Sequence, residues 1–135
     1  MTPRLRTKDV PRTLYANFLK KSEECFHAAS NSFNMKEYNA SAIAAIHSCI
    51  AGCDSMCVYN PGKRSLGENH NEAIKLFKTI KENDAELDRN ANRIFRILNL
   101  KNMAEYEERL ASEKEAGKIV KDCERLLEYI KTQLP

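Results

Sequence analysis

Glycine and proline are scarce in this chain, with 4 of each among 135 residues. β-Sandwiches and β-barrels need many tight turns, in which these two residues are enriched, so the composition argues against both architectures. A collagen-like chain is excluded because it repeats glycine at every third position. A hydrophobic fraction of 42% is enough for a core, which excludes a wholly disordered chain. The shortage of turn-forming residues therefore favours helices.

Long apolar runs and paired cysteines are also lacking. No stretch of 18 apolar residues is present, so we expect no membrane span. The opening MTPRLRTKDV contains no apolar segment like that of a secretory leader. The five cysteines are odd in number and none has CxxC spacing, which argues against a disulfide scaffold. We therefore expect a cytoplasmic protein.

Positive charge is concentrated at the start of the chain. The first 12 residues carry four basic side chains and one acidic one, so the whole net charge of +3 belongs to them. These side chains are Arg4, Arg6, Lys8 and Arg12 against Asp9. Two prolines in the same segment disfavour a helix there. We expect a flexible basic arm over 1–12 and a single helical domain over 13–135, the size of one ordinary domain.

Apolar residues recur at steps of three and four along most of the remaining chain, a period that predicts amphipathic helices. The helix predicted over 36–58 has two adjacent apolar rows and many small residues, so we expect it to be buried at the centre. The sequence thus predicts an all-α, up-and-down bundle of four to five helices. The other predicted helices cover 13–32, a segment from Asn69 or Asn71 to about Asn83, a segment capped by Asp84, and 103–134 after a weak break at 99–102.

The polar side chains that could form a ligand site are concentrated in one segment, NPGKRSLGENH at 60–70. Lys63 and Arg64 precede a predicted helix start at Asn69 and His70, and a basic pair beside a helix N-terminus can bind an anion. The segment lacks the GxxxxGK[ST] pattern of a P-loop. A solvated loop that merely avoids burial explains the same residues, and both interpretations are kept.

The predicted central helix carries two further candidates for a ligand site, His47 and Asp54. They are seven residues apart and lie near one face, so they can form either a buried polar pair or part of the site. Cys49, Cys53 and Cys57 stand on the same helix, spread over about 12 Å, and cannot all reach one metal ion. We interpret these cysteines as core side chains and expect neither a metal nor a cofactor.

Two patterns support a resemblance to a known family. The first is G-x-N-H-x-x-A-x-x-L, which begins at Gly67 and ends at Leu76. The second is K-x-x-A-E-Y at 101–106, followed by the pair Glu115 and Ala116 before an apolar helix. With the alanine-rich helix that contains His47, they resemble the HEPN domains (higher eukaryotes and prokaryotes nucleotide-binding) over residues 13–134.

The resemblance implies a helical bundle that often forms a homodimer, and it implies two functional classes. One class contains metal-independent ribonucleases of prokaryotic defence and toxin–antitoxin systems. The other contains non-catalytic modules that bind a nucleotide, an RNA or a protein partner such as a nucleotidyltransferase.

Active members of the family carry an arginine, usually followed by a polar residue, and a histidine four to six positions later. Arg64, Ser65 and His70 fit that spacing. In active members, however, the motif usually lies near the start of the last long helix, where residues 93–106 of this chain contain no histidine. We therefore expect a divergent, non-catalytic binding module, with a ribonuclease that uses Arg64 and His70 as the alternative.

Overall fold

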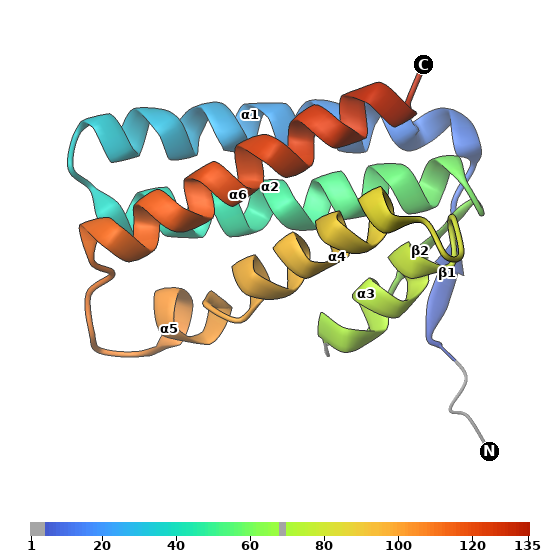
Figure 1. Ribbon diagram of the computed structural model, residues 1–135. Coiled ribbons are helices and arrows are strands. Elements are labelled where there is room, and N and C mark those ends of the chain that lie inside the picture. The colour runs from blue at the N-terminus through green and yellow to red at the C-terminus, as the bar shows by residue number, and fades with distance from the viewer. Residues whose placement is uncertain (1–4, 68–69) are drawn as a thin grey trace.

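The computed structural model describes residues 5–67 and 70–135 (Figure 1). Its helices confirm the all-α prediction, and the described residues contain one small two-stranded sheet besides them. The elements in chain order are β1 (Thr7–Asp9), the 3-10 helix η1 (Arg12–Leu14), α1 (Tyr15–Asn34), α2 (Tyr38–Tyr59), β2 (Lys63–Ser65), α3 (His70–Lys78), α4 (Ala85–Leu98), α5 (Lys101–Tyr106) and α6 (Glu113–Gln133).

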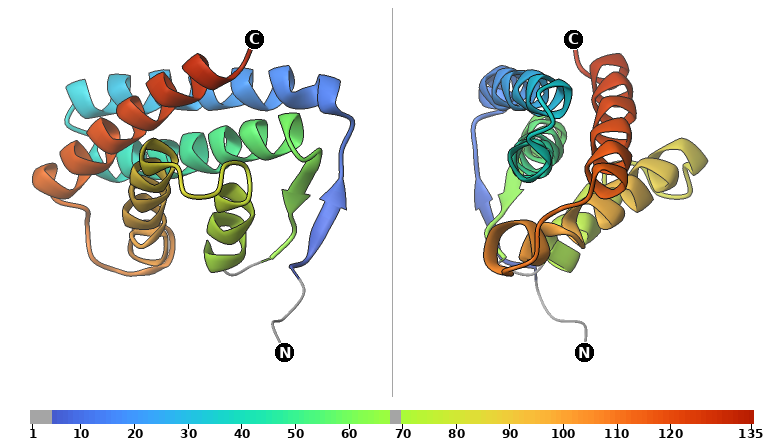
Figure 2. Two further views of the ribbon diagram at one scale, coloured as in Figure 1. Left: turned by 45° about the vertical axis from the view of Figure 1, so that its right-hand side comes forward. Right: turned by 90° about the vertical axis from the view of Figure 1, so that its left-hand side faces the viewer.

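Helix α2 forms the centre of the bundle, as its two apolar rows predict. The helices α1, α6 and α4 lie around it, with the shorter α3 and α5 along its remaining side (Figures 1 and 2). Its side chains are buried on nearly every side, including Ile46, Cys49 and Val58. Burial all round explains why the helix is apolar all round.

Small residues let α1 and α2 pack closely. The Ser22 hydroxyl donates to the Ser48 carbonyl oxygen at 2.7 Å, and the Ser48 hydroxyl donates to the Ser22 carbonyl oxygen at 2.7 Å. One helical turn further along, a Cβ atom at Gly52 would lie 2.9 Å from Cδ1 of Ile130 on α6. Gly52 therefore stands where three helices meet, and a larger side chain would force them apart.

Among the described helices, only α2 has the length and composition that could cross a membrane, with a hydropathy of 1.4 over its most apolar window. Most of that window, 67%, is buried inside the bundle. A core helix surrounded by protein has the same composition, so this feature is weak evidence for a membrane span.

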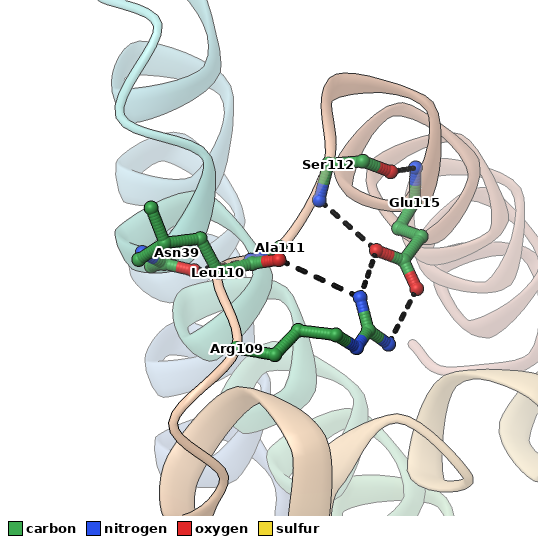
Figure 3. Close-up of polar contacts among 6 residues, drawn as sticks. All are labelled: Asn39, Arg109, Leu110, Ala111, Ser112 and Glu115. Carbon is green, nitrogen blue, oxygen red and sulfur yellow. Dashed lines mark hydrogen bonds and ion pairs between the residues drawn. The ribbon is translucent and has the colours of Figure 1, made fainter.

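The predicted helix over 103–134 is wrong in its first part. The chain breaks at residues 99–100, as expected, but it breaks again at 107–112, between α5 and α6. Figure 3 shows the second break. The Ser112 hydroxyl accepts from the Glu115 backbone N–H at 3.1 Å, and the Glu115 carboxylate accepts from the Ser112 N–H at 3.0 Å and from Arg109. This capping box starts α6.

The segment before α6 is also tied to the start of α2. The Ala111 backbone N–H donates to the Asn39 side-chain oxygen at 2.6 Å (Figure 3). Ala111 itself is buried. This contact fixes the segment that enters α6 against the start of α2.

The start of the chain differs from the predicted flexible arm in the part that the structure describes. Residues Thr7–Asp9 form β1, which pairs antiparallel with β2, and the Arg12 guanidinium carbon lies 4.0 Å from the centre of the Tyr59 ring. The Arg6 guanidinium binds the Glu72 carboxylate at 2.7 and 3.3 Å. Pairing partners far along the chain, which local charge does not reveal, hold this segment on the domain.

The cysteines occupy the core, as predicted. Cys49, Cys53, Cys57 and Cys123 are buried and Cys25 is half-buried, all as free thiols. Burial raises the pKa of the Cys49 thiol well above its usual range, so the thiol stays protonated. Within residues 5–67 and 70–135, no group of three or more histidine, cysteine or acidic side chains could hold a metal ion.

Candidate functional site

A cavity of about 270 Å³ lies where β2 and the start of α3 meet α2 and α5. Three residues singled out in the sequence, Asp54, Arg64 and His70, line this cavity together. Its remaining lining residues are Ile50, Ser65, Leu66, Gly67, Ala73, Leu98 and Lys101. The fold thus brings α2, β2 and α3 to one polar cleft whose walls are partly apolar.

Arg64 reaches the cavity from the middle of β2. Its Nε atom is buried and has no hydrogen-bond partner in the described chain. Its guanidinium carbon lies 5.7 Å from the centre of the Phe18 ring, so an aromatic face supports the cation. Buried donors are nearly always satisfied in folded proteins, and an unsatisfied one at a cavity indicates a place for an acceptor.

Asp54 is the acidic residue among the described residues that line this cavity. Burial raises the pKa of its carboxyl group to about 6, although the nearby Arg64 charge acts in the opposite direction. Above this pH the carboxylate is charged and partly offsets the Arg64 charge. Below it, the cavity becomes more positive.

His70 begins α3 and is half-buried. Burial lowers the pKa of its imidazole, the Lys101 charge lowers it further, and Glu105 opposes both. The ring is therefore neutral at pH 7, and it gains a proton more readily when an anion enters the cavity.

Lys101 is a charged lining residue that the sequence patterns do not assign to the site. It stands at the first position of α5, within the predicted break at 99–102. Lys101 opens the K-x-x-A-E-Y pattern, but that pattern does not place it at the cavity, because the position of α5 against α2 depends on tertiary contacts. Lys101 adds a second positive charge beside Arg64.

The other predicted site residues lie elsewhere. Lys63 precedes Arg64 on the strand and so faces the opposite side, where its Nζ donates to Asp9 Oδ1 at 2.8 Å. His47 does not pair with Asp54 as one interpretation suggested. Its Nε2 lies 3.2 Å from Oε1 of Glu105 on α5, at the surface. Asn69, expected as a helix cap and ligand residue, lies outside the described residues.

Gly67 and Glu72 hold the edge of the cavity in place. The Glu72 carboxylate packs so closely against Gly67 that a Cβ atom there would overlap it. The same carboxylate binds Arg6, and the Leu66 N–H donates to the Arg6 carbonyl oxygen at 2.9 Å. The first described residues therefore position the segment that carries Arg64.

The comparison with protein families agrees with this architecture. No curated protein matches the chain. The family model described as the HEPN domain matches residues 15–133, which is nearly the whole chain and includes every lining residue of the cavity. The chain therefore belongs to the HEPN domain family.

Proposed function

We propose that this protein is a cytoplasmic HEPN-type binding module whose cavity takes the phosphate group of a nucleotide or an RNA. The observation that carries the proposal is the convergence of Arg64, His70 and Lys101 on one cavity, with the Arg64 Nε buried and unpartnered. We include in the proposal that the protein acts as a homodimer in a prokaryotic defence or toxin–antitoxin context, as the family resemblance implies. A protein partner such as a nucleotidyltransferase is the alternative ligand.

Three contributions favour a phosphate in this cavity. Arg64 offers a planar set of donors that matches phosphate oxygens, and Lys101 adds a point charge. His70 opens α3, a helix whose N-terminal N–H groups and dipole attract anions. The apolar residues Ile50 and Leu98 exclude part of the water, which strengthens these electrostatic interactions.

The binding test compares neighbouring cations. We expect Arg64→Gln and Lys101→Gln each to weaken binding of a fluorescently labelled short RNA, or of a nucleotide, by at least about tenfold, because a hydrogen bond to a charged group contributes about 1.5–3 kcal/mol. Fluorescence anisotropy or calorimetry measures the change. The matched control is Lys63→Gln, because Lys63 is paired with Asp9 outside the cavity. Equal losses in all three variants would show that loop charge, and not the cavity, binds the ligand.

A metal-independent ribonuclease is the second candidate, and the shared cavity of Arg64 and His70 supports it. With its pKa lowered, the neutral His70 imidazole can accept the proton of a ribose 2′-OH. The 2′-oxygen then attacks phosphorus, the bond to the 5′-oxygen breaks, and a 2′,3′-cyclic phosphate forms. His70 of a second protomer, protonated when the phosphate enters, would give its proton to the leaving 5′-oxygen while Arg64 stabilises the phosphate charge.

The ribonuclease test is cleavage of a generic RNA in the presence of a chelator. We expect His70→Ala to reduce an intrinsic cleavage rate by at least a hundredfold, a typical contribution of a general base. The control His47→Ala, which changes an exposed histidine outside the cavity, should leave the rate unchanged. Equal rates in the wild type and His70→Ala would exclude this candidate and leave the binding module.

A further inference from the structure

A second cavity, of about 300 Å³, lies in the groove between α4 and α6. On each helix the lining residues are spaced three, one and three positions apart, a spacing that places them on one face of the helix. The lining residues are Glu86, Arg89, Asn90 and Arg93 from α4 and Arg125, Glu128, Tyr129 and Thr132 from α6. This groove shares no residue with the cavity of Arg64 and His70.

The two helices run antiparallel and are in contact along the groove (Figure 1). Beyond one end of the groove, Arg96 donates two hydrogen bonds to the Asp122 carboxylate, at 3.0 and 3.1 Å. Towards the other end, Lys81 Nζ donates to Gln133 Oε1 at 2.6 Å. These contacts fix the register of α4 against α6 and leave a stretch between them with different chemistry.

Within that stretch, the arginines have no acidic partner. Across residues 5–67 and 70–135, no carboxylate lies within ion-pair distance of Arg89, Arg93 or Arg125. Three guanidinium groups in one groove repel one another. The lining residues still carry a net positive charge after Glu86 and Glu128 are included, with Asp84 acting on Tyr129 from outside the lining, so an anion between the arginines would relieve the repulsion.

The floor of the groove contains buried polar groups. Asn90 is 1% exposed, and its side-chain oxygen accepts from Arg93 Nη1 at 2.8 Å, which orients that guanidinium. Tyr129 is 5% exposed, and its hydroxyl has no hydrogen-bond partner in the described chain. Burial, together with the charges of Asp84 and Glu86, raises the pKa of Tyr129 to about 12, so the hydroxyl keeps its proton and can donate.

We propose that the groove between α4 and α6 is a second anion site, which binds a phosphate group through Arg89, Arg93, Arg125 and the Tyr129 hydroxyl. Guanidinium forks match the oxygens of a phosphate in geometry and charge. The buried hydroxyl would gain in the bound state the partner that it lacks in the free protein. The phosphate comes either as a free or singly esterified small molecule or as part of an RNA backbone.

The test follows the two sites separately by NMR at low salt, with inorganic phosphate as the first probe. We expect saturable shifts of the Arg125 and Tyr129 signals, and we expect them to persist in Arg64→Gln, which removes a cation from the other cavity. Arg125→Gln should weaken this binding at least fivefold and Tyr129→Phe about threefold to tenfold. The matched control Lys121→Gln, an exposed cation on α6 that does not line the groove, should bind as the wild type does.

A short RNA without terminal phosphates is the second probe and distinguishes the two sources. Shifts at Arg125 with this RNA support a backbone phosphate, whereas shifts with inorganic phosphate alone support a small ligand. The proposal is overturned if phosphate shifts all basic residues without saturation, or if Arg125→Gln and Tyr129→Phe bind as tightly as the wild type. Because Arg64→Gln reports on the first cavity alone, failure of one site is distinguishable from failure of the other.

Discussion

At the scale of single residues, Asp54 has the least ordinary environment in the candidate site. Its carboxyl group lies in a cavity with Arg64 and yet has a raised pKa of about 6, because burial outweighs the nearby charge. An ionised Asp54 competes with an incoming phosphate for Arg64. A protonated Asp54 does not, so the cavity attracts anions more strongly in mild acid.

We expect the free energy of unfolding to depend on pH because of this buried carboxyl group. Folded Asp54 keeps its proton to about pH 6, whereas an ordinary aspartate loses it near 3.8, so folding takes up a proton between these values. Stability therefore falls as pH rises through that window. We expect Asp54→Asn to remove this fall and to raise the free energy of unfolding above pH 6 by up to about 3 kcal/mol.

Urea unfolding at pH 4, 5, 6 and 7 measures the difference between wild type and Asp54→Asn. The control is Asp88→Asn, which changes an exposed aspartate on α4 and should keep the wild-type pH dependence. Parallel stability curves for the wild type and Asp54→Asn would contradict the raised pKa.

The sequence predicts the members of the site only where they lie close together in the chain. Arg64 and His70 belong to one short segment, so motif spacing was enough to select them. Lys101 and Glu105 come from α5, and only the packing of α5 against α2 brings them to His70 and His47. The pairing of His47 with Asp54 was a reasonable inference from one helix, and it is wrong because a neighbouring helix supplies the partner.

At the scale of elements, apolar periodicity predicts where the long helices lie but predicts the breaks between them poorly. Asp84 caps α4 as predicted, and its side chain accepts from the Leu87 N–H at 2.8 Å. The break at 107–112 contains neither glycine nor proline, so no turn residue marks it. Ser112 and Glu115 have capping-box spacing, and this signal could have located the start of α6.

The two short strands cannot be predicted from a pattern in the sequence. β1 and β2 have three residues each, too few for an alternating pattern to be recognised. Their pairing joins segments more than 50 residues apart, with Lys8 opposite Arg64. Two basic residues opposite each other repel one another in a sheet. The flanking ion pairs Arg6–Glu72 and Lys63–Asp9 offset this repulsion.

At the scale of the whole molecule, the three most exposed large apolar side chains among the described residues lie towards one end. Met35, Tyr106 and Leu110 are 68, 74 and 73% exposed. They belong to the α1–α2 connection, the end of α5 and the segment before α6, which lie at the same end of the bundle (Figure 1). Neighbouring exposed apolar groups are typical of surfaces that contact another protein.

We expect the purified protein to form a homodimer through this end. Light scattering at tens of micromolar should give about twice the chain mass of 15.5 kDa. Leu110→Gln should shift the protein towards the monomer, because it places a polar group in an apolar contact, and Phe95→Gln on α4 is the matched control at another exposed apolar position. A monomer mass for the wild type would contradict both the dimer and the two-protomer ribonuclease.

The burial of α2 also has a consequence for synthesis on the ribosome. Ser22 and Ser48, which join α1 to α2, are 26 residues apart, whereas the Cys123 thiol on α6 contacts the Ala45 carbonyl oxygen 78 residues away. Contacts between segments close in the chain lose less entropy when they form, so we expect the α1–α2 hairpin to assemble first. The nascent hairpin would then leave one apolar side of α2 uncovered until α6 has been translated, and that uncovered surface is the part of the chain most prone to aggregate during synthesis.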